Sequence, residues 1–257
     1  MRFLFLLLFS TAVFSSTLKS QLYSGYVSID DADGYHSGVF FQSNSNDQSL
    51  NLEVGLKYTS VSDIGLSQHE LYLGLDRRLS GRDRVSFSYT DIEEDKYGGN
   101  LYVFGYANQY DGNLELNAKF GILDYDLYDS YQLEGSARST FNSTFYYKHR
   151  YIGALVKESG SDKYYSALEL EVGMQSNRYL GKISSFIGEK RYTLQDPRLF
   201  TWNLGNIHKR GLKVVLGYEI QKNTAIKVAY LNDAIELAKN KKDVSMSTIT
   251  FLLSHSF

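Results

Sequence analysis

The chain of 257 residues contains no cysteine, and this absence excludes disulfides, thiolate metal sites and cysteine nucleophiles. It also excludes a lipid anchor attached to a cysteine near the N-terminus. The net charge is only −2, so the protein lacks the strong positive field that nucleic-acid binding requires. Thiol chemistry, lipoprotein anchoring and a nucleic-acid partner are therefore not expected.

After the N-terminal segment the sequence has no long hydrophobic run. No stretch there approaches the roughly 20 apolar residues that a membrane helix needs. The chain starts with Met1-Arg2, continues with an apolar segment rich in Leu and Phe, and then turns to small residues. This order is typical of a secretory signal peptide, with a buried strand or short helix as the alternative. We predict a signal peptide over residues 1–15, cleaved near Ser15, and a single exported domain over residues 16–257.

A catalytic constellation is also lacking. His36-Ser37 and Ser254-His255 are neighbours in sequence, and neighbours on a strand point to opposite faces, so neither forms a Ser–His pair. The acidic stretch over residues 30–34 has some of the spacing of a calcium loop, but Ile29 occupies the first ligand position. We therefore predict an exposed loop at this stretch, and we expect no enzymatic activity, no cofactor and no bound metal.

The sequence does contain long segments of strict alternation between apolar and polar residues. From Leu50 to Thr59 every second residue is apolar, without an exception. Because side chains alternate across a strand, such a segment has one apolar face and one polar face. Apolar residues that recur at every second position, without a sustained helical repeat, predict an all-β chain. The same alternation recurs over residues 70–76, 84–90, 113–122, 168–175 and 212–221.

Turn-forming stretches such as 44–47 and 80–83 separate the alternating segments and predict about fourteen strands. At about ten residues per strand, these segments fit a transmembrane antiparallel up-and-down β-barrel. Twelve strands is the alternative, because the first hairpin is short and Leu199–Leu204 could be a strand or part of a loop. The predicted strands lie near residues 20–29, 36–43, 48–59, 66–77, 82–91, 99–109, 112–123, 127–137, 140–157, 163–175, 178–189, 211–221, 224–233 and 247–257.

The lengths of the connections indicate an orientation. Connections after even-numbered strands are all short, as periplasmic turns are, and this places the start of the barrel in the periplasm. Connections after odd-numbered strands include Asp91–Gly98, Lys190–Arg210 and the lysine-rich Asn232–Ser245, which we expect to be outer loops. The basic clusters at 208–210 and 239–242 are predicted to lie in these loops, exposed to solvent or in contact with lipopolysaccharide phosphates.

The predicted outer faces suit a bilayer. They carry almost no charge at the strand centres, and tyrosines gather near the strand ends, as at the two interfaces of membrane barrels. A mean hydropathy of −0.31 agrees with a barrel, because only alternate residues face lipid. A soluble β-sandwich with its apolar faces packed together is the alternative.

The end of the chain carries a resemblance to a known superfamily. Ile249, Phe251, Leu253, His255 and the last residue, Phe257, fall on one face of an extended strand. In this the chain resembles Gram-negative outer-membrane β-barrels of the porin type, whose final strand closes the barrel. The resemblance implies that the barrel-assembly machinery recognises Phe257, and that the protein resides in the outer membrane among lipid and lipopolysaccharide. Overall length and the segment from Gly188 to Gly205 also resemble the small YaiO-type outer-membrane barrels.

The polar strand faces predict the wall of a pore. Acids and bases are balanced on these faces, whereas a strongly selective channel would show an excess of one sign. Either a wide lumen solvates these charges and forms a weakly ion-selective pore, or a narrow lumen joins them into a network that plugs the barrel. We predict passive diffusion of small polar solutes, with a non-transporting structural or surface-interaction barrel as the alternative. The predicted pore-lining residues are Glu53, Lys57, Glu70, Asp76, Arg84, Glu115, Lys119, Glu134, Arg138, Lys148, Glu169, Glu171, Lys182, Lys213, Glu219 and Lys227.

Overall fold

The structure is a computed structural model. The predicted signal peptide and the segment Leu199–Leu204 both lie outside the residues that it describes. Among the described residues, no helix is long and apolar enough to cross a membrane. The described residues are 17–45, 47–62, 65–94, 97–158, 160–191, 206–237 and 241–257.

Fourteen antiparallel strands follow one another around a closed barrel, each paired with its neighbours in sequence. The predicted all-β barrel and the larger of the two predicted strand numbers are therefore confirmed. The strands are β1 (Thr17–Ile29), β2 (Ala32–Asn44), β3 (Leu50–Val61), β4 (Leu66–Arg78), β5 (Asp83–Glu94), β6 (Gly98–Gln109), β7 (Leu114–Tyr125), β8 (Tyr128–Thr140), β9 (Phe145–Glu158), β10 (Ser161–Gln175), β11 (Tyr179–Lys190), β12 (Ile207–Gln221), β13 (Thr224–Glu236) and β14 (Asp243–Ser256).

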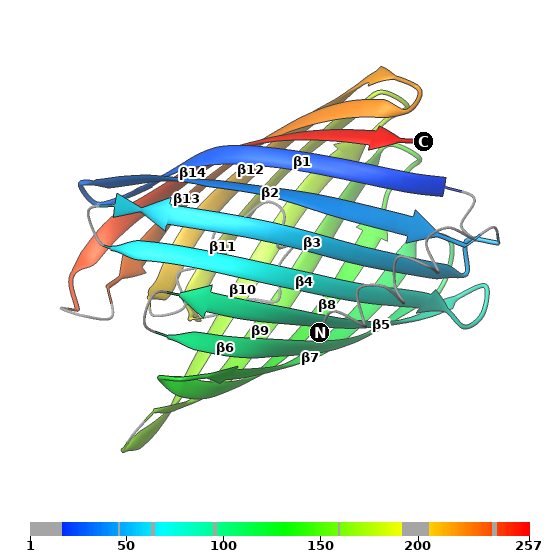
Figure 1. The fold of residues 1–257 in the computed structure, drawn as a ribbon. Coiled ribbons are helices and arrows are strands. Elements are labelled where there is room, and N and C mark those ends of the chain that lie inside the picture. The colour runs from blue at the N-terminus through cyan, green and yellow to red at the C-terminus, as the bar shows by residue number, and fades with distance from the viewer. Residues whose placement is uncertain are drawn as a thin grey trace, which may run out of the picture.

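The first and last strands close the barrel. Strand β1 pairs antiparallel with β14 in continuous register from Lys19 opposite Ser256 to Ile29 opposite Met246, and the two ribbons run side by side in Figure 1. This pairing removes the two sheet edges whose N–H and C=O groups would otherwise lack partners in a bilayer. The final strand thus has the closing position that its sequence predicted.

The barrel has two rims that differ in their connections. The terminal rim carries both Thr17 and Phe257, at the right of Figure 1, together with the turns that follow even-numbered strands. The distal rim carries the connections that follow odd-numbered strands. At the distal rim, Lys242 Nζ donates to Asp30 Oδ2 at 2.6 Å and thereby ties the β13–β14 turn to the first hairpin.

The strands extend further toward the distal rim than predicted, and the predicted outer loops are correspondingly shorter. The stretch Asp91–Gly98 is largely strand, because β5 continues to Glu94 and β6 begins at Gly98. Similarly, β13 and β14 cover most of Asn232–Ser245. Polar residues in these stretches suggested loops, but polar side chains on strand ends that project beyond the apolar belt are also exposed, and the backbone pairing continues.

The predicted loop position of the basic cluster at 208–210 is wrong, because these residues belong to β12. His208 is buried, whereas Lys209 Nζ lies 3.0 Å from Glu236 on the neighbouring strand β13 and 2.8 Å from Asp243 on β14. A register shift between His208 and Arg210 interrupts the alternation of inward and outward side chains there. The apolar–polar alternation of the sequence does not reveal such a shift. Of the second basic cluster, Lys239 lies outside the described residues.

The two faces of the sheet differ as the alternation requires. Large apolar side chains are exposed on the outer face, for example Leu56, Phe104 and Phe251 at 51%, 49% and 60% exposure. The residues between them in sequence point inward and are mostly buried or half-buried. Of the predicted outer face of the final segment, Ile249, Phe251, Leu253 and Phe257 are exposed, and His255 is half-buried.

Apolar side chains also line part of the inner face, which the alternation did not predict. Many come from strand ends at the distal rim, such as Ile29 and Val61, and Ile235 on β13 is fully buried as well. One inner cluster comprises Tyr23, Val27, Ile29, Ala32, Phe40, Val61, Val215, Ala229, Leu231, Ile235, Val244, Met246 and Leu252. A second comprises Ile92, Leu101, Leu123, Tyr125, Tyr128, Ala154, Val156 and Tyr165.

Phe40 provides a test of how much this inner packing stabilises the barrel. Its ring is 1% exposed and lies 5.9 Å from the ring of Tyr23 and 5.8 Å from that of Tyr72, between centroids. We expect Phe40→Ala to lower the free energy of unfolding by about 3–5 kcal/mol, because it leaves a cavity. The measurement is denaturant unfolding of the detergent-refolded protein.

Phe41→Ala is the matched control, because Phe41 is the next residue on the same strand and is 43% exposed on the outer face. Its side chain lies against detergent in the folded state, so we expect a clearly smaller loss. Equal losses for the two variants would show that the inner face is not packed as described.

Candidate functional site

The structure places all sixteen predicted pore-lining residues on the inward strand faces, at the same alternate positions as the buried residues. Their exposure varies strongly along the barrel. Lys57, Glu70 and Glu134 are buried, whereas Arg84, at the start of β5, is largely exposed. Their placement follows from the strand pattern, and their role in lining a conducting pore stays a prediction.

Lys57 and Glu70 form a buried ion pair. Strands β3 and β4 place the two residues directly opposite each other, and Lys57 Nζ lies 2.7 Å from Glu70 Oε1. The side chains are only 2% and 4% exposed, and Gln68 Nε2 donates a second hydrogen bond of 2.7 Å to the same carboxylate oxygen. Two donors on one buried carboxylate compensate for the water that it has lost.

A second buried network centres on Arg150. This residue lies on β9 between two strands that each contribute an acid, Glu134 on β8 and Glu169 on β10. The guanidinium lies 3.5 Å from Glu134 Oε1 and 2.5 Å from Glu169 Oε2. One cation shared between two carboxylates leaves a negative excess, and the buried bases Lys190 and Lys213 lie near enough to interact electrostatically with Glu169.

Sequence reasoning missed several inward charges, among them Arg150 itself. Arg150 is two residues after Lys148 on the same strand and therefore points to the same face. Because Lys148 was predicted to point inward, the alternation could have identified Arg150 as well. Asp233 and His208 were placed at loop boundaries, yet His208 Nδ1 and Asp233 Oδ2 form a buried contact of 2.7 Å between β12 and β13. Lys190 was missed for the same reason.

Toward the terminal rim the inward charges are more accessible to water. Asp76 and Arg84 approach to 3.4 Å with side chains 31% and 49% exposed. Lys182 and Glu171 also approach to 3.4 Å and are partly exposed. The solvated and the networked arrangement, the two alternatives that the sequence left open, are therefore both present at different depths of the barrel.

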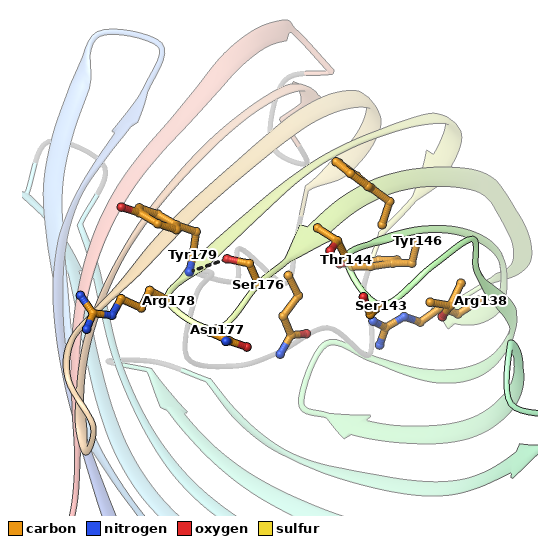
Figure 2. A pocket seen from close by; sticks show the side chains of 11 residues that line it. Arg138, Ser143, Thr144, Tyr146, Ser176, Asn177, Arg178 and Tyr179 are labelled. Atoms are coloured by element: carbon orange, nitrogen blue, oxygen red, sulfur yellow. Dashed lines mark hydrogen bonds between the residues drawn. The ribbon is translucent and has the colours of Figure 1, made fainter.

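A cavity of about 720 Å³ opens at the terminal rim, between the turn 141–144 and the turn 176–178. Figure 2 shows the guanidinium of Arg138 and the amide of Asn177 extending into the same space, whereas Arg178 points away from it. The lining residues are Arg138, Thr140, Ser143, Thr144, Phe145, Tyr146, Gln175, Ser176, Asn177, Arg178 and Tyr179.

The two turns beside this cavity are held by side-chain hydrogen bonds. Asn142 Oδ1 accepts from the backbone N–H groups of Thr144 and Phe145, each at 2.8 Å. Ser176 Oγ accepts from the N–H of Tyr179 at 3.2 Å, the dashed line in Figure 2. Asparagine and serine close turns in this way because their short polar side chains reach their own backbone.

The terminal residue Phe257 lies at the same rim. Its backbone N–H donates to the carbonyl of Leu18 at 2.8 Å, while its ring is 71% exposed and packs edge-on against His255. An exposed ring is accessible to a binding partner, and the predicted role of Phe257 as an assembly signal stays a prediction. Within the described ranges, no group of three or more His, Cys, Asp or Glu residues is arranged to hold a metal ion.

No protein-family model and no curated protein sequence matches the chain. Solved structures match nearly its whole length. A FadL homologue of Pseudomonas aeruginosa superposes with a TM-score of 0.57 at 8% identity, covering 96% of this chain and 92% of that one. The toluene transporter TbuX of Ralstonia pickettii gives 0.56 at 10% identity, covering 95% and 90%. Omp33 of Acinetobacter baumannii gives 0.54 at 10% identity, covering 94% and 99%.

Identities this low show the fold alone. The chain has the fold of Gram-negative outer-membrane β-barrels, as its sequence predicted, and this fold supports a location in the outer membrane.

Removal of Arg150 tests whether the buried network stabilises the barrel. We expect Arg150→Met to lower the free energy of unfolding by about 3–5 kcal/mol, because it leaves Glu134 and Glu169 buried without their shared cation. Denaturant unfolding at neutral pH measures the loss.

The triple variant with Arg150→Met, Glu134→Gln and Glu169→Gln is the control, because it removes all three charges at nearly constant volume. It should regain part of the lost stability, since no carboxylate is left without Arg150, while Lys190 and Lys213 lose the charge of Glu169. If Arg150→Met were as stable as the unaltered protein, the network would contribute nothing.

Proposed function

We propose that the protein is an outer-membrane channel through which small polar solutes diffuse passively, with weak ion selectivity. The observation that carries this proposal is the closed barrel whose inner face combines acids and bases, with the more exposed ones toward the terminal rim. The inward charges missed by the sequence add to both signs, as Arg150 and Asp233 illustrate. Balanced charge on a pore wall gives little preference between anions and cations.

The apolar clusters on the inner face limit what such a channel carries. Ions lose water when they pass a ring of aliphatic side chains, and hydrophobic constrictions of this kind restrict conduction. The inner clusters that contain Val61 and Val156 bring aliphatic side chains, together with tyrosines, to the inner wall. A small conductance and a preference for uncharged polar solutes over strongly hydrated ions are the expected consequences.

A non-transporting barrel with a closed lumen is the second candidate function. The buried ion pairs of Lys57 with Glu70, and of Arg150 with Glu134 and Glu169, favour it. Side chains locked in such pairs stiffen a barrel and fill its interior. In that case the rims and their turns carry the function.

Conductance in a planar bilayer separates the two candidates. For the refolded mature protein we expect small, steady single-channel steps and a reversal potential near zero in a salt gradient. Silence from protein shown to be folded by circular dichroism would contradict the channel and favour the closed barrel.

Paired charge variants then show whether current follows the inner wall. Lys182→Gln with Lys227→Gln removes two half-buried inward bases and should shift the reversal potential toward cation preference. Glu115→Gln with Glu219→Gln removes two inward acids and should shift it the opposite way. If neither pair changes the reversal potential, the current does not pass these side chains.

Orientation in the membrane is tested with an epitope inserted at Lys241, in the β13–β14 turn of the distal rim. We expect antibody to label it on intact cells, because the distal rim faces outward in the proposed orientation. The same epitope between Lys222 and Asn223, at the terminal rim, should be labelled only after the outer membrane is permeabilised. The reverse pattern would invert the orientation.

A further inference from the structure

The terminal-rim cavity is lined by hydrogen-bond donors and contains no carboxylate. Arg138 supplies a guanidinium, Gln175 and Asn177 supply amides, and Ser143 and Thr144 supply hydroxyls. Its volume of about 720 Å³ lies within the range of about 300–1,000 Å³ that is common for small-molecule sites. A lining of this kind favours a solute that carries negative charge and many oxygen atoms.

Arg138 lies in the wall of the cavity, and no carboxylate in the described part of the chain forms an ion pair with it. Its guanidinium carbon lies 3.9 Å from the centroid of the Tyr146 ring, so the planar group stacks on the ring and its edges remain available. Among the described residues no ion pair involves Arg138, and its Nε is buried without a hydrogen-bond partner. Glu115, its cross-strand neighbour on β7, instead accepts a hydrogen bond of 2.8 Å from Asn117.

The ring beneath Arg138 is itself fixed by the adjacent strand. Tyr146 packs directly over Gly173 of β10, and any Cβ at that position would collide with the ring. Its hydroxyl donates to Glu171 Oε1 at 3.0 Å, and Glu171 is also paired with Lys182. Glu171 is thus already engaged by Tyr146 and Lys182.

The turns around the cavity differ in charge from others at the same rim. In the turn between β2 and β3, Asp47 has the capping role, and hydrogen bonds from Ser45 and Ser49 lower the pKa of its carboxyl to about 2. In the turn between β6 and β7, Asp111 accepts from two backbone N–H groups. The neutral residues Asn142 and Ser176 have this role beside the cavity, so no capping carboxylate repels an anion there.

We propose that this cavity binds an acidic sugar, a polyhydroxylated solute with a single carboxylate. The edge of the Arg138 guanidinium donates to the carboxylate, and the amides and hydroxyls of the lining bond to the sugar hydroxyls. Arg138 is the one cation that points into the cavity in Figure 2, so it matches one carboxylate better than a doubly charged phosphate.

This site goes beyond the proposed channel, because binding at the mouth requires a folded barrel but does not require an open lumen. Calorimetric titration in detergent therefore tests it independently of conductance. The probes are glucuronate and glucose, which differ only by the carboxylate. We expect glucuronate to bind measurably and glucose to bind at least about tenfold more weakly, the difference expected for a charge-assisted hydrogen bond.

Arg138→Gln should weaken glucuronate binding about tenfold or more and leave the weak binding of glucose nearly unchanged. Arg82→Gln is the matched control, because Arg82 is an exposed arginine in another turn of the same rim and should not affect either sugar. Asn177→Asp provides a second test in an exposed turn residue whose change should not impair folding. The introduced carboxylate should weaken glucuronate binding more than glucose binding.

Two results would overturn the proposal. One is equal binding of glucuronate and glucose, or no binding of either to the folded protein. The other is unchanged glucuronate binding in both Arg138→Gln and Asn177→Asp. A silent bilayer with intact, Arg138-dependent glucuronate binding would overturn the channel and leave the site standing.

Discussion

The hydrogen-bonded closure between β1 and β14 is the constraint on which the rest of this protein depends. In a bilayer no water is available to backbone N–H and C=O groups, so a sheet is stable there only if its two edges pair with each other. The continuous register from Lys19 opposite Ser256 to Ile29 opposite Met246 provides that pairing. Closure also decides which strand face becomes the interior, because after it one face meets lipid and the other is enclosed.

On the enclosed face, the exposure of charged side chains to water decreases from the terminal rim toward the interior. Partly exposed charges such as Asp76 and Arg84 lie toward the terminal rim, where water reaches them. Deeper inside, Lys57 and Arg150 are buried and each has acids as close neighbours, since an unpaired buried charge is costly. Toward the distal rim apolar clusters share the inner face with buried polar side chains such as Gln68 and Asp233. A solute that enters from the terminal rim therefore meets partly exposed charges first and buried side chains beyond them.

The terminal rim illustrates how turn chemistry and strand pairing together shape a surface. Asparagine and serine close the turns beside the cavity, whereas Asp47 and Asp111 close others at this rim. Either choice satisfies the backbone, but only the neutral one adds no carboxylate to the turns beside the cavity. The stacking of Arg138 on Tyr146 depends in turn on strand β10, because the ring needs the empty position at Gly173. Four strands and two turns thus contribute to a single cavity.

The sequence by itself determined the strand type, the closing position of the last strand and the face of each predicted pore-lining residue. It could do so because side-chain alternation is a local property of an extended chain, visible from Leu50 to Thr59 without any knowledge of partners. Only the tertiary structure decided that Arg150 lies between Glu134 and Glu169, that apolar clusters form on the inner face, and that Arg138 and Asn177 border one cavity. These relations depend on the register between strands, which hydrogen bonding fixes across the sheet. The alternation of side chains within a single strand carries no information about that register.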